Sequence, residues 1–278
     1  MHTPINDLPF DILGYALMTV GLAGYALFLS RGDLRLRRLA SWCSLLACLS
    51  IALGLAARGV QVGHWPLITS YEFALAFVAS ILLLSLLLER REEAKGEGII
   101  ALFLAFLLAT YFLFLTPASL QVARPSLPLL RSWWFLTHTV AAAVGYGAFA
   151  VAGGMGIVYL LRPLLPFLSH WFPEPEALDS ASAYAVRIGF PWMTLSIAAG
   201  GIWALLSWGI FWNWDLKETW TLVVWLVYLF YWHARALPRW PGRRTAIVAA
   251  IGLAVVLFAF LGMRWLAQAV SVEPLQIR

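Results

Sequence analysis

Two histidines of this 278-residue chain lie in long apolar stretches, where ionisable side chains are unusual. His138 lies near the start of one such stretch and His233 near the end of another. An ionisable side chain inside a membrane span is costly and rare, so each histidine marks a candidate functional site. Imidazole is a common iron ligand. At 1.5 Å per helical residue, His233 lies roughly 24 Å beyond Lys217, so we expect the two histidines at opposite membrane faces.

A cluster of tryptophans is the second unusual feature. Aromatic belts at membrane surfaces explain scattered tryptophans but not such clustering. The segment Trp208–Lys217, WGIFWNWDLK, predicts a flat aromatic platform at the membrane surface. Beside a histidine, indole rings suit the planar apolar ring of haem, and they suit lipid, quinone or a partner protein equally. The chain has 15 Trp, and the cluster comprises Trp203, Trp208, Trp212, Trp214, Trp220, Trp225, Trp232 and Trp240.

The composition predicts an all-α integral membrane protein. Hydrophobic residues make up 62% of the chain and charged residues 12%, against about 45–50% and 25% in soluble domains. Each predicted span approaches the roughly 20 apolar residues that cross a bilayer. We expect one polytopic domain, residues 1–278, with about eight transmembrane helices near Phe10–Leu29, Leu39–Ala57, Tyr71–Leu88, Ile99–Leu115, Phe135–Leu161, Ile188–Ser207, Glu218–Ala234 and Thr245–Ala267.

The distribution of basic residues predicts the orientation. Thirteen of the 19 Lys and Arg residues fall in the four connections on one side of the predicted bundle. Positively charged loops stay in the cytoplasm, so both termini and the tryptophan-rich segment are expected outside. The net charge of +5 is therefore interpreted as a topology signal, and nucleic acid is not an expected partner.

The segment WGIFWNWDLKETW (Trp208–Trp220) resembles the WWD domain of cytochrome c assembly proteins, whose pattern is close to WGxxWxWDxKExW. The resemblance extends to VRIGFPWMTLSIAAGGIW before it, to VVWLVYLFYWHARA after it, and upstream to WPLITSYE and WWFLTHTVAAAVGYGAF. The expected eight-span layout is most similar to the CcsA/ResC type of that family.

The resemblance implies a haem-handling subunit of cytochrome c biogenesis, acting as a component of a cytochrome c synthase in the inner (plasma) membrane. It would present haem b at the outer, periplasmic face for thioether attachment to CxxCH apocytochromes, with a CcsB/ResB-like membrane partner and membrane lipid around it. His138 would be an external ligand of haem iron and His233 an intramembrane one. The implied haem-binding residues are His138, His233, Trp208, Trp212, Trp214, Asp215 and Trp220.

Some details and alternatives stay open. Asp215 could cap a helix or contact haem, and Arg124 and Arg131 could bind haem propionates or be solvated loop charges. The family pattern has a further external histidine after the last span, and this chain has none there; Met263 and His64 are weak substitutes. The alternative functions are a HemX-like non-catalytic regulator of tetrapyrrole synthesis and a small-molecule transporter.

Overall fold

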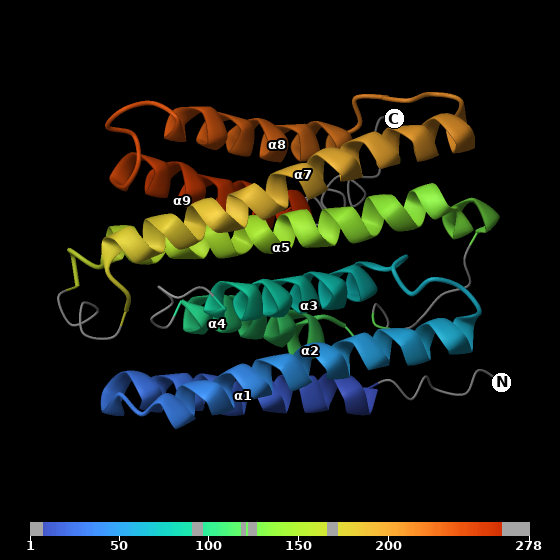
Figure 1. Cartoon of the computed structure of the whole chain (residues 1–278). Helices are drawn as coiled ribbons and strands as arrows, with labels where there is room; N and C mark the ends of the chain where they lie inside the picture. The colour runs from blue at the N-terminus through green and yellow to red at the C-terminus, as the bar shows by residue number, and fades with distance from the viewer. Residues whose placement is uncertain (1–7, 91–96, 118–120, 122–126, 166–171, 263–278) are drawn as a thin grey trace, which may run out of the picture.

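The computed structural model describes residues 8–90, 97–117, 121, 127–165 and 172–262. Within these residues the chain is all-α, and its long helices lie side by side as a bundle (Figure 1), as the composition predicts. The helices are α1 (Leu8–Arg31), α2 (Leu34–Val62), α3 (Ser70–Glu89), α4 (Gly98–Thr110), α5 (Trp133–Leu161), α7 (Pro175–Trp208), α8 (Leu216–Arg235) and α9 (Arg243–Leu257). Short π-helical turns, η1 (Tyr111–Leu115) and η4 (Phe258–Gly262), extend α4 and α9, and a 3₁₀ turn, η3 (Pro128–Arg131), precedes α5.

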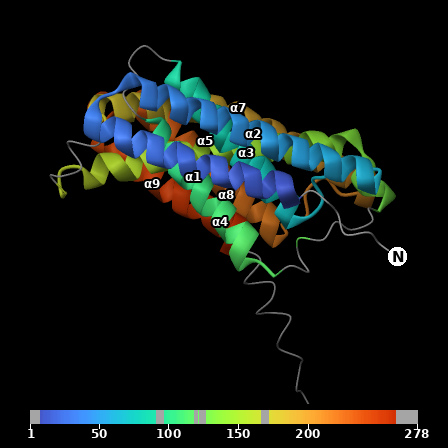
Figure 2. The same cartoon turned by 90° about the horizontal axis from the view of Figure 1, so that it is seen from below.

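Seven of these helices, counted with their π-helical extensions, are long and apolar enough to cross a membrane within the described residues. The remaining one, α8, has 20 residues but carries Lys217, Glu218 and Arg235 near its ends, which lower its mean hydropathy. It lies alongside α7 and α9 in both views of the bundle (Figures 1 and 2), so it occupies the place of the predicted seventh span. The expected end of the last span, Ala267, lies outside the described residues.

Helix α5 is the centre of the bundle. It packs most extensively on α7 and α9 and also contacts α3 and α4, while α1 and α2 form a pair on the far side of α3 and α4 (Figure 1). Small residues allow these close contacts, as is usual between membrane helices. A β-carbon at Gly156 of α5 would lie 2.6 Å from the carbonyl oxygen of Ala246 in α9. This tight core fixes the positions of the helices that carry the two histidines.

Buried polar contacts join the first three helices. The Tyr71 hydroxyl of α3 donates a 2.6 Å hydrogen bond to Asp11 of α1. Arg58 of α2 lies 3.5 Å from the carboxylate of Glu72 in α3, and it donates a hydrogen bond of 2.8 Å to the carbonyl of Gln121. Charged groups in membrane bundles face the interior and pair with one another, and this cluster does both.

Helix α7 starts earlier than expected. The sequence places the start of this span near Ile188, whereas the structure has one continuous helix of 34 residues from Pro175. Proline at the first helical position and Glu176 in the first turn are favourable helix-start signals. At the other end, Gly209 adopts a left-handed conformation (φ 77°) that stops the helix and turns the chain toward α8.

Candidate functional site

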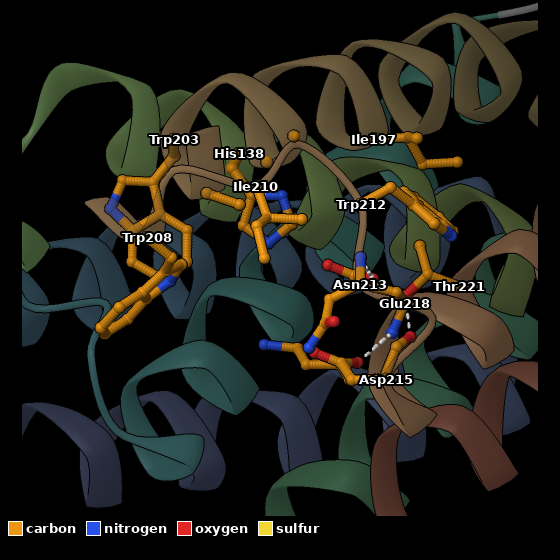
Figure 3. Close-up of a pocket in the computed structure, with 14 residues that line it drawn as sticks. His138, Ile197, Trp203, Trp208, Ile210, Trp212, Asn213, Asp215, Glu218 and Thr221 are labelled. Atoms are coloured by element: carbon orange, nitrogen blue, oxygen red, sulfur yellow. Dashed lines mark hydrogen bonds between the residues drawn. The ribbon is translucent and has the colours of Figure 1, made fainter. Parts of the chain in front are cut away.

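A cavity of about 480 Å³ opens where α5 begins, α7 ends and α8 begins (Figure 3). Its volume is within the range of about 300–1,000 Å³ that is typical of small-ligand sites. Most of its wall comes from the end of α7 and from the tryptophan-rich segment that the sequence singles out. It is lined by His138, Ile197, Gly200, Gly201, Trp203, Ala204, Trp208, Ile210, Trp212, Asn213, Asp215, Lys217, Glu218 and Thr221.

The imidazole of His138 is held by α7. Its Nδ1 lies 2.9 Å from the carbonyl oxygen of Ser196, and the Ser196 hydroxyl donates a 3.0 Å hydrogen bond to the His138 carbonyl. Because a carbonyl only accepts, Nδ1 carries a proton, and in the neutral tautomer of this kind the lone pair is on Nε2. Gly200 makes room for the ring, since a β-carbon there would lie 2.6 Å from Nδ1. In that tautomer the imidazole can bind a metal through Nε2.

The chain between α7 and α8 is fixed by two carboxylates. Asp215 caps α8 by accepting a 2.7 Å hydrogen bond from the Glu218 amide. The Glu218 side chain accepts a 2.8 Å hydrogen bond from the Asn213 amide, and Figure 3 shows these groups together below Trp212. Between them Trp214 has a left-handed backbone (φ 55°), which costs a non-glycine residue about 1–3 kcal/mol and persists only where surrounding contacts enforce it.

The predicted tryptophans divide into two groups. Trp208 and Trp212 line the cavity, and the indole nitrogen of Trp212 is buried without an acceptor among the described residues. Trp214 is 68% exposed and packs its ring edge against Trp212, with ring centroids 5.8 Å apart. The ring of Trp220 packs on Phe258 of η4 at 4.4 Å. Neither Trp214 nor Trp220 is among the cavity-lining residues.

His233 lies elsewhere, at the other end of α8, and is exposed. Its Nδ1 lies 2.9 Å from the Leu229 carbonyl of the same helix, which leaves Nε2 without a bond to that helix. Leu226, Phe230 and His233 follow one another at helical spacing on one face. Beside that face runs an apolar groove of about 340 Å³ between α8 and α9, lined by Val223, Leu226, Val227, Phe230, Val248 and Ile251.

Two residues that support the site received no individual role from the sequence: Trp203 lines the cavity, and Ser196 is bonded to His138 without lining the cavity. The indole nitrogen of Trp203 donates a 3.0 Å hydrogen bond to the Leu129 carbonyl. The pair Gly200–Gly201 in an apolar helix was the available signal, because adjacent glycines there favour close approach of another group.

The weaker candidates lie apart from the cavity. His64 and Arg131 are not among its lining residues, and the Nδ1 of His64 lies 3.0 Å from the neighbouring Trp65 carbonyl. Met263 and Arg124 lie outside the described residues.

Comparison with known proteins gives the family. Residues 67–271 match the family described as cytochrome C assembly protein. A Guillardia theta protein named cytochrome c biogenesis protein CcsA is 31% identical, over 81% of this chain and 82% of its own length. A protein of the same name from Prochlorococcus marinus (strain MIT 9515) is 30% identical, over 96% of this chain and 92% of its own length.

The fold is also found in a solved structure. The cytochrome c haem lyase CcmF superposes with a TM-score of 0.63 at 19% identity. The alignment covers 99% of this chain but only 52% of the lyase, so this chain spans about half the length of that protein and shares its fold. With the family match over most of the sequence and relatives at 30% identity or above, the chain belongs to the cytochrome c assembly protein family.

Proposed function

We propose that this protein is a haem-handling membrane subunit of cytochrome c biogenesis and holds haem b in the cavity beside His138. One observation carries the proposal: His138 lines a cavity with several tryptophans, and its Nδ1 is bonded to Ser196, which leaves Nε2 available for a metal in the neutral tautomer. The names of the curated relatives support this function over a regulator of tetrapyrrole synthesis or a small-molecule transporter.

The cavity residues suit the chemistry of haem, which is a substrate here. His138 offers an axial ligand to the iron, and the indole faces of Trp208 and Trp212 offer an apolar wall for the ring. Lys217 is the one Lys or Arg among the described residues that line the cavity, and it offers a cation to a propionate. The buried indole nitrogen of Trp212 is a further donor for an oxygen of the bound molecule.

In the proposed reaction the protein positions haem and supplies no nucleophile. A cysteine thiol of a CxxCH apocytochrome adds across a haem vinyl group, forming a carbon–sulfur bond while its proton goes to the other vinyl carbon. Holding the ring beside the arriving peptide removes much of the entropic barrier to this addition. A CcsB/ResB-like membrane protein is the proposed partner.

His233 would serve a second haem position on the α8–α9 groove. The groove is apolar, lies on the side of the bundle, and has His233 on the same helix face. The partner would supply the opposite axial ligand. By the distribution of Lys and Arg, this end of the bundle is proposed to face the cytoplasm, and the cavity and both termini to face the outside of the inner (plasma) membrane.

An absorption spectrum of the detergent-purified protein, co-expressed with a CcsB-like partner, tests the proposal. We expect sharp α and β bands after dithionite reduction, and we expect them to weaken in His138→Ala and in His233→Ala. His64→Ala is the control, because His64 does not line the cavity. A colourless preparation, or one whose spectrum is the same in all three variants, would contradict the proposed haem sites.

A further inference from the structure

The carboxylate of Asp179, near the start of α7, receives four hydrogen bonds from α8, α9 and the turn between them. Arg235 at the end of α8 donates from Nη1 to Oδ1 and from Nη2 to Oδ2, both at 2.7 Å. The Gly242 amide donates to Oδ1 at 3.1 Å, and the Thr245 hydroxyl shares its one hydrogen between Oδ1 at 3.0 Å and the Gly242 carbonyl at 2.9 Å. We call these four residues the Asp179 clamp. It joins α7, the last turn of α8 and the first turn of α9.

The clamp is a strong and partly buried contact. The side chains of Arg235 and Asp179 are 28% and 14% exposed. Bidentate pairs between arginine and carboxylate are among the strongest hydrogen-bonded pairs in proteins and fix geometry in a plane. No described residue of the clamp lines the tryptophan-rich cavity or the α8–α9 groove. The contact is therefore separate from both proposed haem positions.

The clamp acts on the helix turn that carries His233. Arg235 follows His233 by two residues, so at 3.6 residues per turn the two side chains leave α8 in nearly opposite directions. Tyr231, on the inner side of α8, is fully buried, and its hydroxyl lies 3.2 Å from the Ser182 hydroxyl of α7. The inner side of this turn is thus fastened to α7, and His233 is left on the outer side.

The imidazole of His233 has no anchor on another helix among the described residues. Its Nδ1 bonds to Leu229 of α8 itself. The direction of Nε2 therefore follows the rotation of α8 directly, whereas the ring of His138 is held by α7. Any contact that fixes the rotation of the last turn of α8 also fixes where the Nε2 of His233 points.

We infer that Asp179 is a positioning residue for His233. By holding Arg235, Gly242 and Thr245 together, it sets the rotation of α8 and the start of α9, and so keeps the imidazole aligned with the α8–α9 groove for iron ligation. The inference rests on the proposed haem role of His233. The proposed role is indirect: Asp179 acts on His233 through Arg235, without contacting the imidazole or haem.

The test uses a His138→Ala background co-expressed with the partner, so that the reduced spectrum reports only haem bound through His233. Asp179→Asn is expected to lower the low-spin fraction of this haem about three-fold or more, and added imidazole is expected to restore it by supplying the missing ligand. Thr245→Val, which removes one of the four bonds, is expected to give a smaller loss, also restored by imidazole. Glu174→Gln is the matched control, because its pairing with Arg162 involves a largely exposed carboxylate near the same end of α7.

The possible outcomes distinguish the positioning role of Asp179 from the haem role of His233. If Asp179→Asn and Thr245→Val leave the low-spin fraction unchanged while His233→Ala removes it, the positioning role is wrong and the haem role of His233 stands. If both variants lose haem and imidazole restores neither, Asp179 has a general structural role, which also overturns the inference. If His233→Ala itself leaves the spectrum unchanged, the proposed haem role fails and the inference fails with it.

Discussion

The two histidine sites of this protein differ in what holds the imidazole. His138 lies in a cavity and bonds across to Ser196, 58 residues away on another helix. His233 is exposed and bonds to Leu229, four residues away on its own helix. The orientation of the first imidazole therefore depends on how α5 packs on α7, and that of the second depends on how α8 is rotated.

The residues around the two histidines also differ in polarity. The cavity combines tryptophans with Asn213, Asp215, Lys217 and Glu218, whereas the groove residues are all apolar. Under the proposed function, the cavity is suited to hold haem in one orientation for a reaction, since both the iron and a propionate find partners. If haem also binds the groove, as proposed, the apolar walls would hold the ring without fixing its rotation.

The largest expected effect that separates the sites comes from Gly200→Ala. The added β-carbon would lie 2.6 Å from the His138 Nδ1 and 3.0 Å from Cε1, so the ring must move off Ser196. We expect the affinity of the cavity for haem to fall about ten-fold, or about 1.4 kcal/mol. The affinity of the α8–α9 groove for haem should not change. Haem titration of the purified variant measures both. Gly24→Ala in α1 is the control, because its β-carbon meets Ala40 at an ordinary 3.4 Å. If Gly200→Ala binds haem in the cavity with wild-type affinity, the contact between His138 and Ser196 does not control haem binding there.

A smaller effect is expected from Lys217→Gln. Loss of one charge-assisted hydrogen bond to a propionate should weaken cavity haem about five-fold, or about 1 kcal/mol. Haem dimethyl ester, whose carboxylates are blocked, should bind wild type and Lys217→Gln equally, and the titration is repeated with it for that reason. Arg131→Gln serves as control because Arg131 does not line the cavity. An equal loss with haem and with the ester would rule out the propionate contact.

The smallest effect on haem binding is expected from Asp215, whose substitution acts on the stability of the helix start. Because its carboxylate caps α8, Asp215→Ala should destabilise the helix start by about 1 kcal/mol and lower the thermal unfolding midpoint of the purified protein. Asp215→Asn should be close to wild type, since asparagine caps equally well. If the asparagine variant instead loses cavity haem as strongly as the alanine variant, the charge of Asp215 acts on haem directly, and the capping role is not its main contribution.

Apolar stretches made the fold predictable from the sequence. The eight expected spans follow the order of the eight α-helices among the described residues, and the expected seventh span, from Glu218, starts two residues after α8 starts at Leu216. The early start of α7 was missed because the polar stretch after Pro175 lowers hydropathy, although proline and glutamate there favour helix initiation.

The site was only partly predictable. The motif identified Trp208, Trp212 and Asp215, all of which line the cavity with His138. It could not show that Trp220 turns to Phe258 or that Ser196 orients His138. Both depend on which helix faces which. Which helices become neighbours is decided by packing between segments far apart in the chain, such as the close approach of α5 to α7. A single sequence contains little information about such contacts.

The buried polar contacts of the first three helices have a consequence for biosynthesis. Asp11 of α1 and Arg58 of α2 both contact residues of α3, Tyr71 and Glu72 respectively. A ribosome completes α1 and α2 before it reaches Tyr71. The native arrangement of the first hairpin is therefore completed only when the third helix arrives, and these three helices are expected to leave the insertion machinery as one unit.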